Sequence, residues 1–139
     1  MARTRYLADT SVFARLPKSR VAAAFAPLAA AGLVGVSSPV MFELGYSARS
    51  PQDYQALADR LSSFPLVATT DGDHRRALAI QAALATESHH RAVSLVDGLV
   101  AAVAESRDLI VLHYDADFEL VAHVTGQAQE WIVARGLAD

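Results

Sequence analysis

Five acidic residues follow short apolar stretches or lie among apolar neighbours, and they are the residues of this chain best suited to chemistry. They are Asp9, Glu43, Asp97, Asp115 and Asp117. A carboxylate among apolar side chains is costly unless it is paired or binds a metal ion, and no lysine or arginine lies within five residues of Asp97. Ligand sets made only of oxygen favour Mg²⁺ or Mn²⁺ over Zn²⁺.

If these acids converge in the fold, their mutual repulsion has to be offset. Two unit charges about 4 Å apart repel by roughly 4 kcal/mol at an effective dielectric of 20. Four or five carboxylates would therefore take up protons or recruit a divalent cation. A carboxylate-bound Mg²⁺ can bridge phosphate oxygens, acidify a bound water and stabilise a leaving oxygen. The acids predict phosphodiester hydrolysis with Mg²⁺ as the cofactor and Mn²⁺ as its substitute.

Each acid also has a purely structural interpretation. Asp9, Asp97 and Asp115 could be helix N-caps that accept hydrogen bonds from free backbone N–H groups. Glu43 could be an exposed helical residue paired with Arg49. We favour convergence because the acids recur, singly or as a pair, at one strand-to-helix connection after another.

The elements that position these acids alternate between short strands and helices. Strands are predicted at 5–8, 33–36, 109–112 and 131–133, and 64–68 is either an edge strand or an extended connection. Helices are predicted at 12–16, 21–31, 40–47, 51–62, from 71 onward, 94–105 and 115–124. This order predicts an α/β fold with a central, mainly parallel sheet of four to five strands flanked by helices on both faces. Binding sites in such folds form beyond the carboxyl ends of the strands.

Composition limits the alternatives. The 139 residues suit one domain spanning 1–139, and their 53% apolar content excludes a disordered chain. The absence of cysteine excludes a disulfide scaffold or a thiolate metal site. A net charge of −3 argues against binding nucleic acid through bulk positive charge alone.

One uncharged segment, 21–42, is long enough to span a bilayer. Prolines and glycines interrupt it, so we interpret it as a helix end, a buried strand and the start of another helix. The N-terminal residues reach Asp9 before any signal-type apolar stretch develops. We therefore expect no membrane segment and a cytoplasmic location.

Four motifs in order carry a family resemblance: Tyr-Leu-Ala-Asp-Thr-Ser at 6–11, the helix with Glu43, Asp-Gly-Leu-Val-Ala-Ala at 97–102, and Val-Leu-His-Tyr-Asp-Ala-Asp-Phe at 111–118. Over nearly its whole length the chain resembles PIN-domain ribonucleases, specifically the VapC-type toxins of VapBC toxin–antitoxin modules. The resemblance implies a Mg²⁺-dependent endoribonuclease that cuts cellular RNA and is silenced by a cognate VapB-type antitoxin. It also implies a homodimer and a larger complex with the antitoxin. Gly98 departs from the family pattern, in which a larger residue is common.

The resemblance further implies roles for the acids. Asp9, Glu43, Asp97 and Asp115 match the family's acidic quartet, and Asp117 matches an additional acid found in many members. Asp9 and Asp97 would bind the principal metal directly, while Asp115 and Asp117 would complete its shell or hold a second ion. Glu43 would bind through water or orient the nucleophile.

Further residues near the first acid could contact RNA. Thr10 and Ser11 could hydrogen-bond the acids or a phosphate, or could serve as cap residues. Arg15 and Arg20 belong to a small basic stretch, and arginine suits bidentate phosphate contact. A solvated helical surface is the alternative explanation for both arginines.

A non-catalytic α/β interaction module is the main alternative function. In that interpretation the acids are helix caps, and the alanine-rich helices between 12 and 46 form a groove for a partner helix. His113 could approach the metal, although an outer-shell or surface role fits better.

Overall fold

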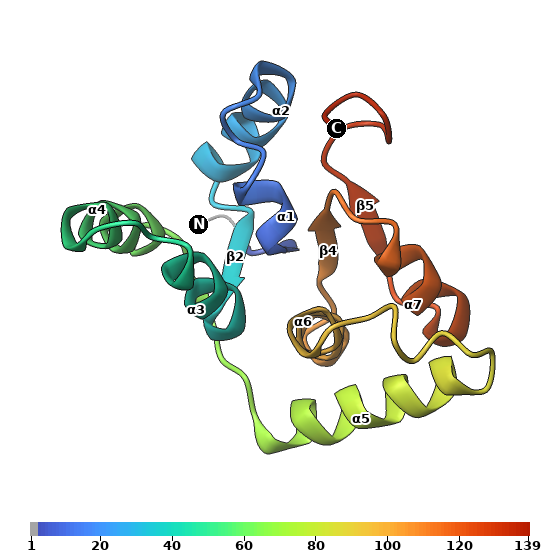
Figure 1. The fold of residues 1–139 in the computed structure, drawn as a ribbon. Coiled ribbons are helices and arrows are strands. Elements are labelled where there is room, and N and C mark those ends of the chain that lie inside the picture. Colours follow the sequence, from blue (N-terminus) through green and yellow to red (C-terminus); the bar gives the residue numbers. More distant parts are fainter. Residues whose placement is uncertain (1–2) are drawn as a thin grey trace.

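A computed structural model of the protein describes residues 3–139, which form a five-stranded parallel sheet with helices on both faces (Figure 1). The strand order is β3-β2-β1-β4-β5, and every neighbouring pair is parallel. The strands are β1 (Tyr6–Ala8), β2 (Val34–Ser37), β3 (Leu66–Val67), β4 (Ile110–His113) and β5 (Gln129–Trp131). The predicted α/β fold is confirmed, and 64–68 does contain an edge strand.

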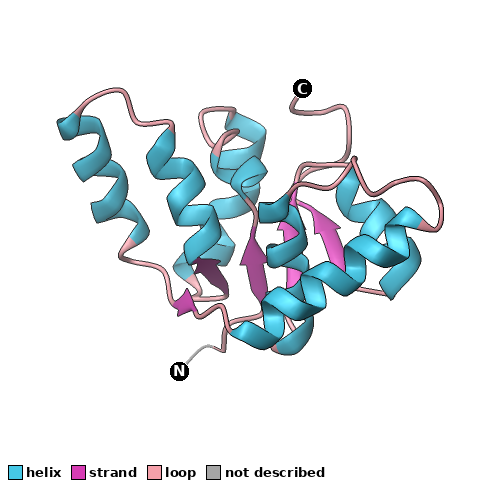
Figure 2. Cartoon of the chain, turned by 60° about the horizontal axis from the view of Figure 1, so that its bottom comes forward, coloured by secondary structure: helices cyan, strands magenta, loops and turns pink. Residues whose placement is uncertain are grey.

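Within residues 3–139, seven helices surround the sheet (Figure 2). They are α1 (Thr10–Phe13), α2 (Ser19–Ala30), α3 (Ser38–Tyr46), α4 (Pro51–Leu61), α5 (Asp71–Ala85), α6 (Leu95–Ser106) and α7 (Asp117–Thr125). One of them, α5, packs on other helices rather than on the strands. Side chains alternate across a strand, so Leu7 of β1 packs with α3, α4 and α6, whereas Tyr6 and Ala8 pack with α1, α2 and the C-terminal segment. The central strand is thereby buried on both faces, as expected for a parallel sheet.

Helix α6 is the most deeply buried helix, with every residue from Gly98 to Ala104 inside the protein. One of its sides faces the sheet, and its other side packs against α5 through small and branched apolar residues. A Cβ added at Gly98 would lie 3.8 Å from the Ala77 Cβ, which is an ordinary contact. The glycine that departs from the family pattern is therefore not required by packing here.

Several predicted boundaries differ from the structure by two or three residues, and three of them have a local explanation; α2 and α3 also begin two residues earlier than predicted, and the first helix ends at 13 rather than 16. The last strand is β5 at 129–131 rather than 131–133, because its pairing with β4 begins at Gln129 opposite Val111 and ends where the Ile132 N–H donates to the His113 carbonyl at 2.8 Å. The first helix begins at 10 rather than 12, because the Asp9 carboxylate caps it. The last helix begins at 117 rather than 115, because the Asp115 side chain accepts the Asp117 N–H at 2.9 Å.

The uncharged segment 21–42 divides as predicted into most of α2, the strand β2 and the first half of α3. Within residues 3–139, no helix combines the length and the apolar character needed to cross a bilayer.

The start of α5 is tied to the end of α6 by the buried Asp73 side chain. Its carboxylate accepts hydrogen bonds from the Thr70 backbone at 2.9 Å, the Ser106 hydroxyl at 2.8 Å and the Arg107 guanidinium at 3.1 Å. Burial alone would raise the pKa of Asp73, but these hydrogen bonds outweigh burial and hold the pKa below its usual value. The joint keeps α5 fixed against α6, the helix that carries Asp97.

We predict that Asp73→Ala lowers the free energy of unfolding at pH 7 by about 2 kcal/mol, because it leaves a partly buried guanidinium and a helix cap without their partner. Since the folded pKa is lowered, the contribution of Asp73 is present above pH about 4 and is lost as the pH falls through the folded pKa. Urea unfolding from pH 7 to pH 3 measures both effects. The matched control is Asp71→Ala, an exposed first-turn residue of the same helix; equal losses for the two variants would contradict this account.

Candidate metal centre

Three carboxylates from separate stretches of chain meet at one edge of the sheet. Asp9, Asp97 and Asp115 each offer an oxygen atom, and these atoms all lie within 4.8 Å of one another. Asp9 directly follows β1, and Asp115 follows β4, the strand that pairs with β1. Asp97 lies in the first turn of α6. The predicted convergence is therefore confirmed for these three acids.

The Asp9 side chain is almost completely buried and is held by Ser11. Its Oδ2 atom accepts the Ser11 backbone N–H at 3.0 Å and the Ser11 hydroxyl at 2.7 Å. The same hydroxyl accepts the Tyr114 N–H at 2.9 Å, which links the end of β1 to the loop after β4. The other carboxylate oxygen, Oδ1, is buried without any hydrogen-bond partner within the described chain. Asp9 is thus a helix cap through one oxygen and offers the other oxygen as a ligand.

Asp97 cannot be explained as the cap of α6, because Ser94 occupies that position and its hydroxyl accepts the Asp97 N–H at 3.2 Å. Burial, reinforced by the charges of Asp9 and Asp115, raises the pKa of Asp97 to about 7. Burial also raises the pKa of Asp9, and the hydrogen bonds from Ser11 offset only part of this effect. Two neighbouring acids with raised pKa values indicate a site that a cation would stabilise.

Asp115 is oriented by His113, which is completely buried. The His113 Nδ1 atom accepts the Asp115 backbone N–H at 3.0 Å, and its Nε2 atom hydrogen-bonds to the Gln129 side-chain oxygen. Burial lowers the pKa of His113, which favours the neutral ring that can accept at one nitrogen and donate at the other. The predicted surface alternative for His113 was wrong, and the outer-shell alternative fits; the signal in the sequence was a histidine two residues before an acid.

Asp117 and Glu43 lie outside this three-acid group. Asp117 is the first residue of α7, and burial together with the adjacent Asp115 raises its pKa. Glu43 projects from α3 and lines a groove together with Thr10. The pairing of Glu43 with Arg49 does not occur among the ion pairs of residues 3–139.

The four residues predicted to contact RNA have different environments. Ser11 uses its hydroxyl to hold Asp9, whereas the Thr10 hydroxyl oxygen is buried without a partner within the described chain. Arg15 stacks over the Tyr114 ring, with its guanidinium carbon 4.7 Å from the ring centroid. Arg20 is exposed on α2.

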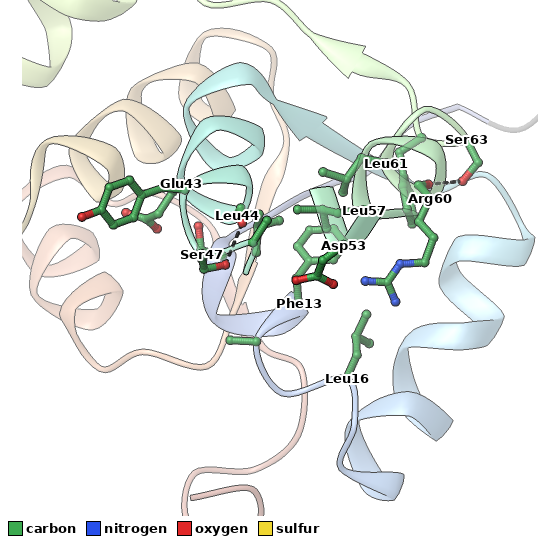
Figure 3. Close-up of a pocket in the computed structure, with 15 residues that line it drawn as sticks. Phe13, Leu16, Glu43, Leu44, Ser47, Asp53, Leu57, Arg60, Leu61 and Ser63 are labelled. Atoms are coloured by element: carbon green, nitrogen blue, oxygen red, sulfur yellow. Dashed lines mark hydrogen bonds between the residues drawn. The ribbon is translucent and has the colours of Figure 1, made fainter. Parts of the chain in front are cut away.

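An apolar groove of about 720 Å³ begins at Glu43 and Thr10 and runs between α1, α3 and α4. Figure 3 shows Leu57 and Leu61 of α4 on one wall, with Glu43 at one end and Arg60 at the other. The groove therefore ends beside Thr10, the residue that follows Asp9, and none of the three clustered acids lines it.

The donor set fits a hard divalent cation. It consists only of carboxylate oxygens, and one of the three carboxylates, that of Asp9, has an oxygen, Oδ1, that is buried without a hydrogen bond in the described structure. A buried carboxylate oxygen without a partner is costly, and coordination to Mg²⁺ or Mn²⁺ removes that cost.

Comparisons with known proteins agree with this geometry. The PIN domain family matches residues 6–124. Ribonuclease VapC51 of Mycobacterium tuberculosis is 48% identical over 135 residues, which cover 97% of this chain and 98% of that protein. Ribonuclease VapC18 of the same organism is 38% identical over 133 residues, which cover 94% of this chain and 97% of that protein.

Among solved structures, DNA-bound VapBC from Salmonella typhimurium has a chain that superposes with a TM-score of 0.76 at 18% identity, covering 94% of this chain and 100% of that chain. VapC20 of Mycobacterium tuberculosis, a sarcin-ricin loop cleaving toxin, superposes with a TM-score of 0.62 at 22% identity, covering 82% of this chain and 92% of that one. These two structures support the fold, and the sequence matches add the family: the chain belongs to the PIN-domain family, among the VapC ribonucleases.

Proposed function

We propose that this protein is a Mg²⁺-dependent endoribonuclease toxin that a cognate VapB-type antitoxin neutralises. One observation carries the proposal: three carboxylates offer oxygens within 4.8 Å of one another, and one of these groups keeps a buried oxygen without a hydrogen-bond partner. Names of relatives such as ribonuclease VapC51 support RNA as the substrate. We further propose one nuclease domain spanning 1–139, acting in the cytoplasm.

In this proposal the more buried acids bind the cation directly, and the less buried ones complete its coordination. Asp9 and Asp97, which have raised pKa values, bind the principal cation directly. Asp115 completes the shell, and Asp117, adjacent to Asp115, either joins it or holds a second ion. A cation bound there would bring positive charge to a phosphodiester and acidify water at the site.

The remaining groups keep the acids in place or act on the nucleophile. Ser11 holds one oxygen of Asp9, which fixes the orientation of the carboxylate and leaves the other oxygen without a hydrogen bond in the described structure. His113 fixes the backbone at Asp115. Glu43 lies outside the three-acid group and lines the groove beside Thr10, a position from which a carboxylate can orient a water molecule or accept its proton.

The groove between α1, α3 and α4 suits an amphipathic helix of the antitoxin, because its walls are mainly apolar and its ends carry charge at Glu43 and Arg60. A helix seated there would cover Glu43 and Thr10, the residue that follows Asp9. Phe42, on the same helix as Glu43, is 81% exposed and does not line the groove. We propose the surface around Phe42 for a homodimer, which would assemble further with the antitoxin.

We predict that Asp97→Asn reduces RNA cleavage by at least 100-fold and abolishes tight Mn²⁺ binding, because it removes a charged ligand. Titration calorimetry with Mn²⁺ and a cleavage assay on cellular RNA measure the two effects. Asp108→Asn, in the turn before β4, is the matched control and should behave as wild type. Full cleavage by Asp97→Asn with an unchanged fold would exclude the proposed site.

The pKa of Asp97 gives a second prediction with a defined sign. Its folded value of about 7 lies above the unfolded value, so in metal-free protein its contribution to stability is present below pH about 4 and is lost as the pH rises through 7. Mn²⁺ affinity should rise over the same range, because the metal displaces the proton. Asp97→Asn should therefore be more stable than wild type at pH 8 without metal; lower stability of the variant at pH 8 would contradict the repulsion described here.

For the groove, we predict that Ala14→Trp lowers affinity for the purified cognate antitoxin by more than tenfold. Ala14 is exposed and lines the groove, so the indole fills space without disturbing the core. Ala26→Trp, exposed on α2 outside the groove, is the matched control. Calorimetry with both variants tests the site, and equal affinities would refute this location for the antitoxin.

A further inference from the structure

A second hollow, distinct from the apolar groove, is lined by Asp115. It measures about 360 Å³ and shares no lining residue with the groove. Beyond Asp115 itself, its walls carry two arginines, Arg15 and Arg135, and two aromatic rings, Tyr114 and Trp131. Guanidinium groups beside aromatic rings, next to an acidic group that would bind a cation, are suited to a polyanion rather than to an apolar partner.

Arg15 is fixed in place yet retains free donors. Its Nε donates to the Ala138 carbonyl at 3.2 Å and its Nη1 to the Ser11 carbonyl at 3.2 Å, while the guanidinium lies over the Tyr114 ring. These bonds use two of the five N–H donors of a guanidinium. The remaining N–H donors of Arg15 are therefore free at the hollow. Because the side chain is already fixed, binding a ligand there costs little further side-chain entropy.

Arg135 is the more available of the two cations. It is exposed, its guanidinium carbon lies 5.7 Å from the centroid of the Trp131 ring, and it forms no hydrogen bond or ion pair with residues 3–139. Trp131 is itself held, because its indole N–H donates to Glu119 at 2.9 Å and its ring meets Tyr114 edge to face. A held aromatic ring thus supports a cation whose donors all remain free.

A second carboxylate that lines the hollow, that of Asp139, is held in place by hydrogen bonds. The Asp139 carboxylate accepts the Tyr114 hydroxyl at 2.7 Å, and the Lys18 ammonium donates to the Asp139 backbone oxygen at 2.5 Å. The Tyr114 hydroxyl also accepts the backbone N–H groups of Gly136 and Ala138, at 2.8 and 3.0 Å. The C-terminal segment therefore closes one side of the hollow while leaving the two guanidinium groups as its main charged donors.

We propose that this hollow binds a backbone phosphate of single-stranded RNA adjacent to the phosphodiester that is cut, with Arg135 and Arg15 as the donors. The inference rests on the proposed ribonuclease function and adds to it the direction in which the substrate leaves the acidic group: over β5 and the C-terminal segment, away from the groove. Arg135 was not singled out in the sequence, because only the fold brings it from the chain end to the side of Asp115.

Binding of a labelled, mixed-sequence single-stranded oligoribonucleotide tests the inference, with Ca²⁺ replacing Mg²⁺ so that the RNA is retained. We expect Arg135→Gln to weaken binding at least fivefold by fluorescence anisotropy and to reduce the slope of log affinity against log salt by about 0.7, the value for one lost phosphate contact. Arg135→Lys should retain most of the salt slope but only part of the affinity, because it keeps the charge and loses the planar fork. Mn²⁺ affinity should stay unchanged in both variants.

The matched control is Arg75→Gln, an exposed arginine on α5, which both ribbon views show away from the C-terminal segment (Figures 1 and 2). Equal binding by Arg135→Gln and Arg75→Gln would overturn the inference. So would a loss of affinity by Arg135→Gln for the antitoxin alone, because the hollow would then be part of the antitoxin site. If wild-type protein binds this RNA through Arg135 but never cuts RNA with Mg²⁺ or Mn²⁺, the ribonuclease proposal fails while the phosphate site stands.

Discussion

Mutual repulsion among three buried or half-buried carboxylates is the constraint on which this structure depends. Without a cation, burial and the neighbouring charges within 4.8 Å both disfavour the ionised carboxylates, and burial, with a smaller contribution from these charges, raises the pKa values of Asp9 and Asp97. The parallel pairing of β1 with β4 and the burial of α6 from Gly98 to Ala104 supply the packing that holds the acids together nonetheless. The packing of the sheet and helices thus keeps the three carboxylates close together, and a bound divalent cation would reduce their repulsion.

The same polar groups that end the strands also fix the geometry of the site. Asp9 caps α1 through one oxygen and keeps the other free, so the helix cap and the metal-ligand interpretations of this residue are compatible. The Ser11 hydroxyl then joins the loop after β1 to the loop after β4, while His113 holds the backbone at Asp115 from within β4 and hydrogen-bonds across to Gln129 of β5. Ligands held this way need little rearrangement when a cation binds, which is the usual role of outer-shell hydrogen bonds.

Much of this could be predicted from the sequence because it is local. Apolar runs of strand length, cap residues and acids at strand ends gave the α/β order and the three acids that converge. Glu43 and Asp117 could not be separated from those three, because distance across the fold is not encoded in spacing along the chain. The place of His113 before Asp115 marked it as a candidate, but its burial and its bond to Gln129 depend on a distant strand. Arg135 lies beside Asp115 only in the folded chain, so no local pattern marked it.

The most direct test of the central claim is the anomalous diffraction of crystals of this protein grown with Mn²⁺. We expect a strong Mn²⁺ peak coordinated by oxygens of Asp9, Asp97 and Asp115, with Asp9 Oδ1 among the ligands. If saturating Mn²⁺ gives no peak between these three side chains, or binds only elsewhere on the protein, the metal site proposed here is wrong.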